Sequence, residues 1–344
     1  MSDAADARTV NRLDERRLDA YLHEHLQGFA GPLTVQQFTQ GQSNPTYLLR
    51  TPLREYVLRR KPDGTLLTSA HAIDREYRVM SALGAHTRVP VPRTFVMCVD
   101  ESVIGSSFFV MERVEGRIFW DICLPEIPRE QRAAYFDAMN AALAALHSVD
   151  FVAIGLGDFG KPGDYVRRQI KRWSNQYQQD TEAGRVPALD ALADWLDAHA
   201  PDSPEAAIVH GDFRCDNLIF HTTQPQVQAI LDWELSTVGH PLADFAYHLM
   251  MYYVPDMAIP GLRDRDLVAL GIPSREDYVA LYCSRTGRNS VSLDFYVVFN
   301  LFRFAAICHG IRGRLARGTA VSARAREYAA GVERLAQIGL ALTR

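Results

Sequence analysis

The 344-residue sequence changes its hydrophobic pattern about a third of the way along, near Glu115 and Gly116. Before this point, short segments typical of β-strands are separated by turns rich in Gly, Pro and Asn. After it, apolar residues recur mostly at the spacing of amphipathic helices. The pattern therefore predicts an α+β protein with a first lobe over residues 1–114 and a second, mostly helical lobe over residues 115–344.

The predicted first lobe is a small, mostly antiparallel sheet that carries one internal helix. An amphipathic helix over residues 12–29 precedes the sheet. The internal helix covers residues 72–84, and Gly84 is its expected C-cap because glycine is common just after the last turn of a helix. The five expected strands are LTVQQFT, TYLLR, YVLRRK, RTFVMCV and SFFVMERV.

The helical pattern of the second lobe is interrupted by the stretch AAIVHGDFRCDNLIFHTTQPQVQAILDWE. A buried strand leads into a polar turn, and a hairpin with the loop TTQP follows. Pairing in this hairpin places Leu218 roughly opposite Leu231. We therefore expect Asn217 and Asp232 to lie together at one end of the hairpin.

Composition excludes several classes of protein. The net charge of −4 provides no general attraction for nucleic acid, and no uninterrupted apolar run has the length of a membrane span. The N-terminal residues lack the apolar core of a signal peptide. An odd number of cysteines without C-x-x-C spacing favours reduced thiols, so we expect a cytoplasmic protein. The five are Cys98, Cys123, Cys215, Cys283 and Cys308.

The polar turn contains residue types that suit phosphate chemistry. An amide oxygen from Asn217 and a carboxylate from Asp232 are hard oxygen donors, the ligands that Mg²⁺ prefers. Asp212, on the same loop, could accept a proton from an incoming hydroxyl. Arg214 could supply a fixed positive charge for phosphate oxygens.

The spacing of these residues resembles the catalytic core of the protein-kinase-like fold, in which D-x-x-x-x-N is followed by an aspartate after an apolar strand. HGDFRCDN, ILDWE and GHPLADFAYHL are more similar to the aminoglycoside phosphotransferase and choline kinase branch. GQSNPTYLL, YVLRRKP, AIDREYRVM and FFVMERVEGR resemble the phosphotransferase domains related to the N-terminal part of the acyl-CoA dehydrogenase 10/11 proteins. This similarity runs from about residue 33 to the end, and it implies a bilobal fold and a kinase that uses ATP and Mg²⁺.

The resemblance also implies roles for individual residues. It makes Asp212 the catalytic base and Arg214 a residue that stabilises the transferred phosphoryl group, with Asn217 and Asp232 as the magnesium ligands. It assigns nucleotide binding to the turn containing Gly41, Ser43 and Asn44, to Arg59 and Glu76, and to the backbone around Glu112 and Val114.

One position departs from the usual family pattern. The strand residue that is normally lysine is Arg59, with Lys61 two residues further on. Arginine can still bridge Glu76 and nucleotide phosphates, although its reach and planarity differ from those of lysine. The similar subgroup also has arginine here. The substitution leaves open how tightly a nucleotide binds.

Several polar residues near the turn have plainer interpretations. We expect His210 to be a buried histidine that hydrogen-bonds the loop backbone, and Asp244 to brace the loop. Cys215 is interpreted as a bystander. Glu234 could contact a metal ligand without binding the metal itself, or it could have no role in the site.

The segment from Asn300 to Arg344 holds eight arginines but only two glutamates. These arginines could lie on a solvated helix face, or they could line the site of an anionic acceptor. The resemblance to the acyl-CoA dehydrogenase 10/11 domains implies a hydroxy acid or a hydroxyacyl thioester as that acceptor. The alternatives are a kinase for aminoglycosides or amino alcohols, a nucleotide-binding regulatory module without catalysis, and a metallohydrolase. The metallohydrolase would use His210, Asp212, Asp232 and His240. The choice between ATP and GTP and the oligomeric state stay open.

Overall fold

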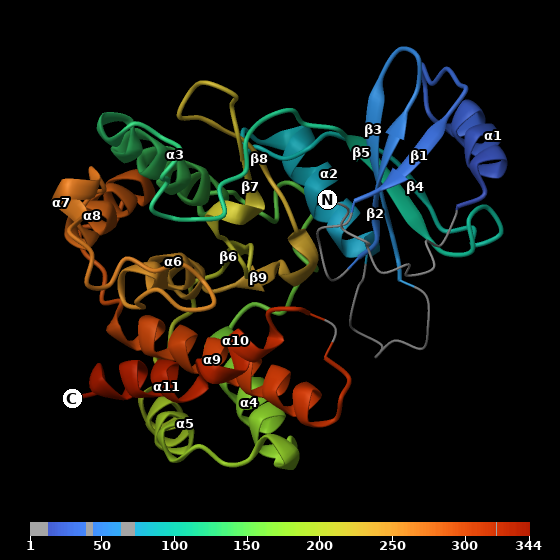
Figure 1. Ribbon diagram of the computed structural model, residues 1–344. Coiled ribbons are helices and arrows are strands. Elements are labelled where there is room, and N and C mark those ends of the chain that lie inside the picture. The colour runs from blue at the N-terminus through green and yellow to red at the C-terminus, as the bar shows by residue number, and fades with distance from the viewer. Residues whose placement is uncertain (1–12, 39–43, 63–72, 321) are drawn as a thin grey trace, which may run out of the picture. The chain divides into compact units, whose positions relative to one another are not determined.

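The computed structural model describes residues 13–38, 44–62, 73–320 and 322–344, and Figure 1 shows their helices and strands. The chain divides into two compact units. The first contains the residues up to His86 together with Val91–Val114, and the second contains Thr87–Pro90 together with Glu115–Arg344. Thr87–Pro90, which the sequence placed in the first lobe, therefore packs with the second unit.

The first unit is built on a five-stranded antiparallel sheet in the order β1-β2-β3-β5-β4. Its core combines apolar side chains from the sheet with Leu18 and Leu22 of α1. All five strands and the internal helix are where the sequence predicts them. The elements are α1 (Glu15–His25), β1 (Thr34–Gln37), β2 (Thr46–Arg50), β3 (Glu55–Arg60), α2 (Ile73–His86), β4 (Thr94–Cys98) and β5 (Phe108–Glu112).

Helix α2 packs against β4 and β5, and it ends two residues later than predicted. Gly84 lies inside the helix, so its prediction as a C-cap is wrong. The absence of a side chain there serves packing, because a Cβ atom at Gly84 would come within 3.3 Å of Val91 Cγ2. The helix ends at His86, shortly before Pro90, whose ring disfavours helical geometry in the residue before it.

The second unit is mostly helical. Its central helix is α9 (Asp294–Ala316), which contacts α4, α5, α6, α10 and α11 (Figure 1). By length and composition α9 could cross a membrane, but 78% of its most apolar window is buried inside the protein, as expected for a core helix. The helices are α3 (Arg129–His147), α4 (Tyr165–Gln179), α5 (Pro187–His199), α6 (Pro241–Leu249), α7 (Leu267–Leu270), α8 (Arg275–Thr286), α9, α10 (Ala325–Ala330) and α11 (Val332–Ala341).

Two short antiparallel pairs of strands lie within this unit. One pair is β6 (Ala207–Val209) with β9 (Thr237–Gly239), and the other is the predicted hairpin of β7 (Leu218–Phe220) and β8 (Val227–Ile230). Strand β9 was not predicted. The hairpin register differs by one residue from the prediction, because Leu218 pairs with Ile230 rather than Leu231. A bulge between Ile219 and Phe220 accompanies this pairing.

Candidate active site

The loop after β6 is held by buried partners on both sides. Asp244, in the first turn of α6, accepts hydrogen bonds from the backbone N–H groups of His210 (2.7 Å) and Gly211 (2.8 Å). Arg303 of α9 donates to the Gly211 carbonyl oxygen at 2.7 Å. Gly211 has φ +85°, and a Cβ atom there would meet the Leu235 carbonyl oxygen at 2.9 Å, so glycine is required. Contacts from α6 and α9 therefore hold this loop in place.

Asp244 has the bracing role that the sequence predicted for it. Burial acts to raise the pKa of this carboxyl group, but hydrogen bonds from His147 and from the His210 backbone lower it on balance. The His147 Nε2 atom lies 3.1 Å from Asp244 Oδ2. Asp244 thus stays ionised and satisfies loop N–H groups that would otherwise be buried without partners.

His210 is the buried, loop-bonding histidine that the sequence predicted. Its Nδ1 accepts from the backbone N–H of Asp212 at 3.2 Å, so Nε2 carries the proton and donates to the Leu231 carbonyl oxygen at 2.8 Å. This links the turn after β6 to the end of β8. Because both ring nitrogens are used, His210 is unsuited to bind a metal.

Asp212 lies at the centre of the polar turn and is half-buried. Asn217 Nδ2 donates to its backbone carbonyl oxygen at 2.9 Å and to its Oδ2 at 3.2 Å. The hydroxyl of Tyr247, on α6, donates to Oδ1. Each carboxylate oxygen has two lone pairs, so each can accept another hydrogen bond. The carboxylate is thus oriented but still able to receive a proton.

The two predicted metal ligands lie at the ends of the paired strands β7 and β8. The Leu231 N–H donates to the Asn217 carbonyl oxygen at 2.8 Å, and Asp232 follows directly. Asp232 has φ +64°, a left-handed conformation that is costly for a residue other than glycine and is common at functional sites. Because Asn217 Nδ2 faces Asp212, its oxygen is the atom left for a cation. These half-buried oxygen donors suit Mg²⁺.

Arg214 makes contacts that the sequence did not predict. It donates through Nε and Nη2 to the two carboxylate oxygens of Asp216, and its Nε lies 3.9 Å from Asp212 Oδ1. Burial disfavours its charge, but nearby Tyr247, Asp212 and Asp216 more than offset this and raise the pKa of Arg214. Arg214 therefore holds a fixed positive charge next to Asp212. Its role towards phosphate stays a prediction.

The Arg59–Glu76 pair expected in the first unit is present. Arg59 Nη1 lies 3.2 Å from Glu76 Oε1, and the Glu76 side chain is 1% exposed. Lys61 directly follows the last residue of β3, Arg60, and its N–H donates to the Ser107 carbonyl oxygen at 3.0 Å. Arg59 therefore takes the position of the usual strand lysine in this ion pair.

The other predicted nucleotide-binding residues are only partly described. Gly41 and Ser43 lie outside the described residues. Asn44 is 6% exposed, and within the described chain its side-chain oxygen and nitrogen have no hydrogen-bond partner. The Glu112 N–H donates to the Arg93 carbonyl oxygen at 2.7 Å, so its own carbonyl is the backbone group that could bind a base. Val114 is the last residue of the first unit.

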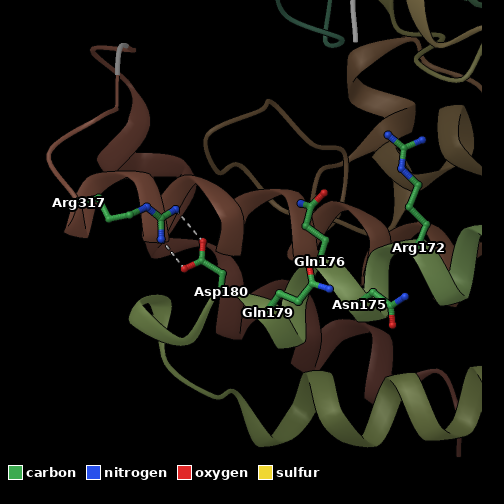
Figure 2. A pocket seen from close by; sticks show the side chains of 6 residues that line it. All are labelled: Arg172, Asn175, Gln176, Gln179, Asp180 and Arg317. Carbon is green, nitrogen blue, oxygen red and sulfur yellow. Dashed lines mark hydrogen bonds and ion pairs between the residues drawn. The ribbon is translucent and has the colours of Figure 1, made fainter. Parts of the chain in front are cut away.

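Four of the eight C-terminal arginines are engaged in contacts within the second unit. Arg303 is buried, Arg312 pairs with Glu333 at 2.6 Å, and Arg324 pairs with Glu327 at 2.9 Å. Arg317 donates to both carboxylate oxygens of Asp180, at 2.7 and 3.0 Å, in the shallow polar hollow of Figure 2. These four are committed to other contacts, which the sequence could not show because most of the partners are distant in the chain.

A pocket within the second unit adjoins the polar turn. Two residues that contact the Asp212 carboxylate, Arg214 and Tyr247, line it, as does Asp216. The rest of the lining is mostly apolar. Cys215, also in this lining, is buried, and burial raises the pKa of its thiol to about 12, which agrees with its interpretation as a bystander rather than a nucleophile.

The metallohydrolase alternative finds no support in the described residues. His240 accepts the Leu242 N–H at Nδ1 (3.2 Å), and its Nε2 contacts the Ser203 and Tyr296 hydroxyls. Within the described chain, no group of three or more His, Cys, Asp or Glu side chains could hold a metal ion. A site formed by one asparagine and one aspartate is a different kind of site and fits Mg²⁺ better than a hydrolytic zinc centre.

Comparison with known proteins identifies the family. Residues 34–281 match the phosphotransferase enzyme family. This chain belongs to that family. It is 45% identical to acyl-CoA dehydrogenase family member 10 of Mus musculus over 92% of its length, and 39% identical to member 11 of Homo sapiens over 100%. It is homologous to the phosphotransferase portion of these proteins and spans only 30% and 45% of their lengths.

Solved structures place the chain in the protein-kinase-like fold of this family. A Ralstonia eutropha protein provisionally classed as an aminoglycoside phosphotransferase is 47% identical, with a TM-score of 0.89 over 96% of this chain and 98% of that one. A thermostable mutant of the aminoglycoside phosphotransferase APH(4)-Ia, in complex with ADP and hygromycin B, has a TM-score of 0.62 over 96% and 98% of the chains. At 14% identity the second likeness concerns the fold alone.

Proposed function

We propose that this protein is an ATP- and Mg²⁺-dependent kinase that phosphorylates a hydroxyl group of a small molecule. The observation that carries the proposal is the half-buried Asp212 carboxylate, oriented by Asn217 and Tyr247 beside a pocket. A carboxylate so placed can accept a hydroxyl proton and leave the oxygen aligned for attack. Membership of the phosphotransferase family supports the same chemistry.

Residues of the second unit would have separate roles in phosphoryl transfer. As the acceptor oxygen bonds to the γ-phosphorus, the bond to the bridging oxygen of ADP breaks and the hydroxyl proton passes to Asp212. Asn217 and Asp232 would hold the magnesium ion, which neutralises phosphate charge when bound. Arg214 would add a fixed positive charge. Transition states of this kind are loose, so positioning and charge account for most of the catalysis.

The first unit would bind the nucleotide. Arg59, held by Glu76, would contact phosphate oxygens, and the Glu112 carbonyl oxygen would accept a hydrogen bond from an adenine amino group. The ADP named in the APH(4)-Ia complex supports nucleotide binding by this fold. Formation of the Arg59–Glu76 pair indicates that arginine at this position preserves the arrangement, which favours an active kinase over a regulatory module.

For the acceptor, we propose a hydroxy acid or a hydroxyacyl thioester rather than an aminoglycoside. The similarity to two acyl-CoA dehydrogenase family members supports an acyl compound. In the pocket next to Asp212, Asp216 is already paired with Arg214, so little negative charge remains for a polycationic antibiotic. The pairing of several C-terminal arginines means that any attraction for an anion comes from fewer residues than the sequence suggested.

The proposal is tested by measuring ADP release from ATP and Mg²⁺ with hydroxyacyl-CoA, hydroxy acid, amino alcohol, sugar and aminoglycoside acceptors. We expect turnover with a hydroxyacyl compound, confirmed by phosphate on the product and abolished by EDTA. Rapid turnover of aminoglycosides with none of hydroxyacyl compounds would refute the acceptor class. ATP binding without turnover of any acceptor would favour the regulatory module.

A further inference from the structure

The pocket beside the polar turn has an unusually apolar wall for a site next to charged groups. Its lining outside the loop that contains Asp212 comes from the segment after Gly116, from Tyr247 and His248 of α6, and from the chain after α6. The apolar side chains concerned are Trp120, Ile122, Met250, Met251, Ile259 and Pro260. A hydroxyl compound that was polar throughout would gain little from such a wall.

The position of the pocket ties this apolar wall to the reacting group. Phe213 and Arg214, the two residues after Asp212, line the pocket, and so does Tyr247, whose hydroxyl bonds the Asp212 carboxylate. A hydroxyl that reaches Asp212 from this side therefore brings its neighbouring carbons against the apolar side chains. The polar part of the wall consists of the Arg214–Asp216 pair, whose charges largely cancel, together with the side chains of Tyr247 and His248.

The exposure of Trp120 is a second observation that favours binding of an apolar group in this pocket. Its surface is 60% exposed, although tryptophan is usually well buried in folded proteins. Met250 and Met251 line the same pocket, and methionine adapts its shape to apolar ligands of different length. An aliphatic chain packed against the indole of Trp120 would remove the apolar surfaces of both from water.

We propose that this pocket binds an apolar arm on the acceptor, attached close to the carbon that bears the hydroxyl, and that Trp120 and Met251 set its preferred length. This rests on the proposed kinase function and narrows it to alcohols with an aliphatic chain. Burial of each methylene contributes a roughly fourfold gain in transition-state binding until the pocket is full. Specificity for the acceptor is thus hydrophobic near the reacting hydroxyl.

The test measures kcat/KM for hydroxybutyrate, hydroxyhexanoate and hydroxyoctanoate, each supplied as the coenzyme A thioester, in the wild type and in Trp120→Ala. We expect kcat/KM to rise with chain length in the wild type. Trp120→Ala should lower it about tenfold for the longest acceptor and less than twofold for the shortest. The matched control is Val152→Ala, which removes another exposed apolar side chain, 65% exposed, that does not line the pocket.

The outcomes separate this inference from the proposed function. Turnover of all three acceptors at equal kcat/KM, with Trp120→Ala no different from Val152→Ala, would overturn the apolar arm and leave the kinase intact. No turnover of any acceptor in the wider screen would overturn the kinase itself. Equal losses for short and long acceptors in Trp120→Ala would show a general structural effect and would also contradict a chain-length role.

Discussion

The Asp212 carboxylate is oriented through both of its oxygens, one by Asn217 and one by Tyr247. Burial keeps the Tyr247 hydroxyl protonated by raising its pKa well above the ordinary value, so it remains a donor. The guanidinium carbon of Arg303 lies 5.0 Å from the centre of the Tyr247 ring, which helps to fix the ring. Tyr247 therefore positions the Asp212 carboxylate, the base that we propose.

We expect Tyr247→Phe to lower kcat by about tenfold to a hundredfold, since a hydrogen bond to a charged group contributes roughly 1.5–3 kcal/mol. KM for ATP should stay within twofold, because nucleotide binding does not involve this hydroxyl. Steady-state kinetics with the preferred acceptor provide both constants.

The matched control is Tyr252→Phe, which removes a hydroxyl that bonds the Pro273 carbonyl oxygen at 3.1 Å. This variant should keep near-wild-type kcat. If both tyrosine variants lost activity equally, or if Tyr247→Phe lost none, the positioning role would be wrong.

At single positions, the sequence predicted contacts between residues close together in the chain and missed contacts between residues far apart in it. The spacing of Asp212, Asn217 and Asp232 within one strand–turn–hairpin made their convergence predictable. Tyr247 and Arg303 could not be inferred, because they come from helices α6 and α9 and reach the turn only in the folded chain. Asp216 is only two residues from Arg214 in the sequence. The turn geometry that brings the two side chains together could not be predicted from the sequence.

At the scale of elements, helix α6 anchors the catalytic loop. Asp244 in its first turn binds two loop N–H groups and His147 at once. Two of these contacts, to His147 and to the His210 N–H, use Oδ2, and the third uses Oδ1. The Asp244 carboxylate thus fixes the loop relative to helix α6.

Asp244→Ala should destabilise the protein by about 3–5 kcal/mol, because it leaves buried hydrogen-bond donors without a partner. The free energy of unfolding in urea, followed by circular dichroism, measures the change. The exposed Asp197 of α5 provides the control, since Asp197→Ala should alter stability by less than about 0.5 kcal/mol. A similarly small effect in Asp244→Ala would contradict the bracing role.

The elements themselves show where local patterns suffice. The strands of the first unit were predictable because alternating apolar residues and turn residues agree along this stretch. The end of α2 was not predictable, because the glycine at position 84 is explained by close packing against Val91 and not by a role as a C-cap. Strand β9 has only three residues and depends on its partner β6, so its own sequence carries little signal.

At the scale of the whole molecule, buried histidines link stability to pH. Burial lowers the pKa of His240 and of His248 to about 4, against an ordinary value of 6.5. Both are thus neutral in the folded protein near pH 6, where the unfolded chain takes up protons. Stability from this source is present above pH 6.5 and is lost as the pH falls towards 4.

We expect the free energy of unfolding to fall by about 2 kcal/mol per buried histidine between pH 7 and pH 5. In His248→Gln, the decrease in the free energy of unfolding between pH 7 and pH 5 should be smaller by about 2 kcal/mol, because glutamine does not titrate. Urea denaturation at the two pH values measures it. Replacement of the exposed His199 by Gln is the control and should leave the fall unchanged. An unaltered fall in His248→Gln would contradict the assignment.

The overall architecture was predictable because composition, strand pattern and helix pattern change together near Glu115. The exception is Thr87–Pro90, whose Pro90 carbonyl oxygen accepts from the Ile230 N–H of β8 within the second unit. A contact between residues so far apart in sequence leaves no local pattern. Substrate identity is likewise hidden in the sequence, because the pocket wall combines residues from separate segments.

The central claim is that Asp212 is the base of a phosphoryl transfer, and one comparison tests it most directly. Asp212→Asn keeps the shape of the side chain but removes its ability to take a proton, so turnover should fall by about 10²–10⁴ while ATP binding is unchanged. Single-turnover phosphate transfer and calorimetric ATP titration of the same preparation measure both. Near-wild-type transfer by Asp212→Asn would contradict the account.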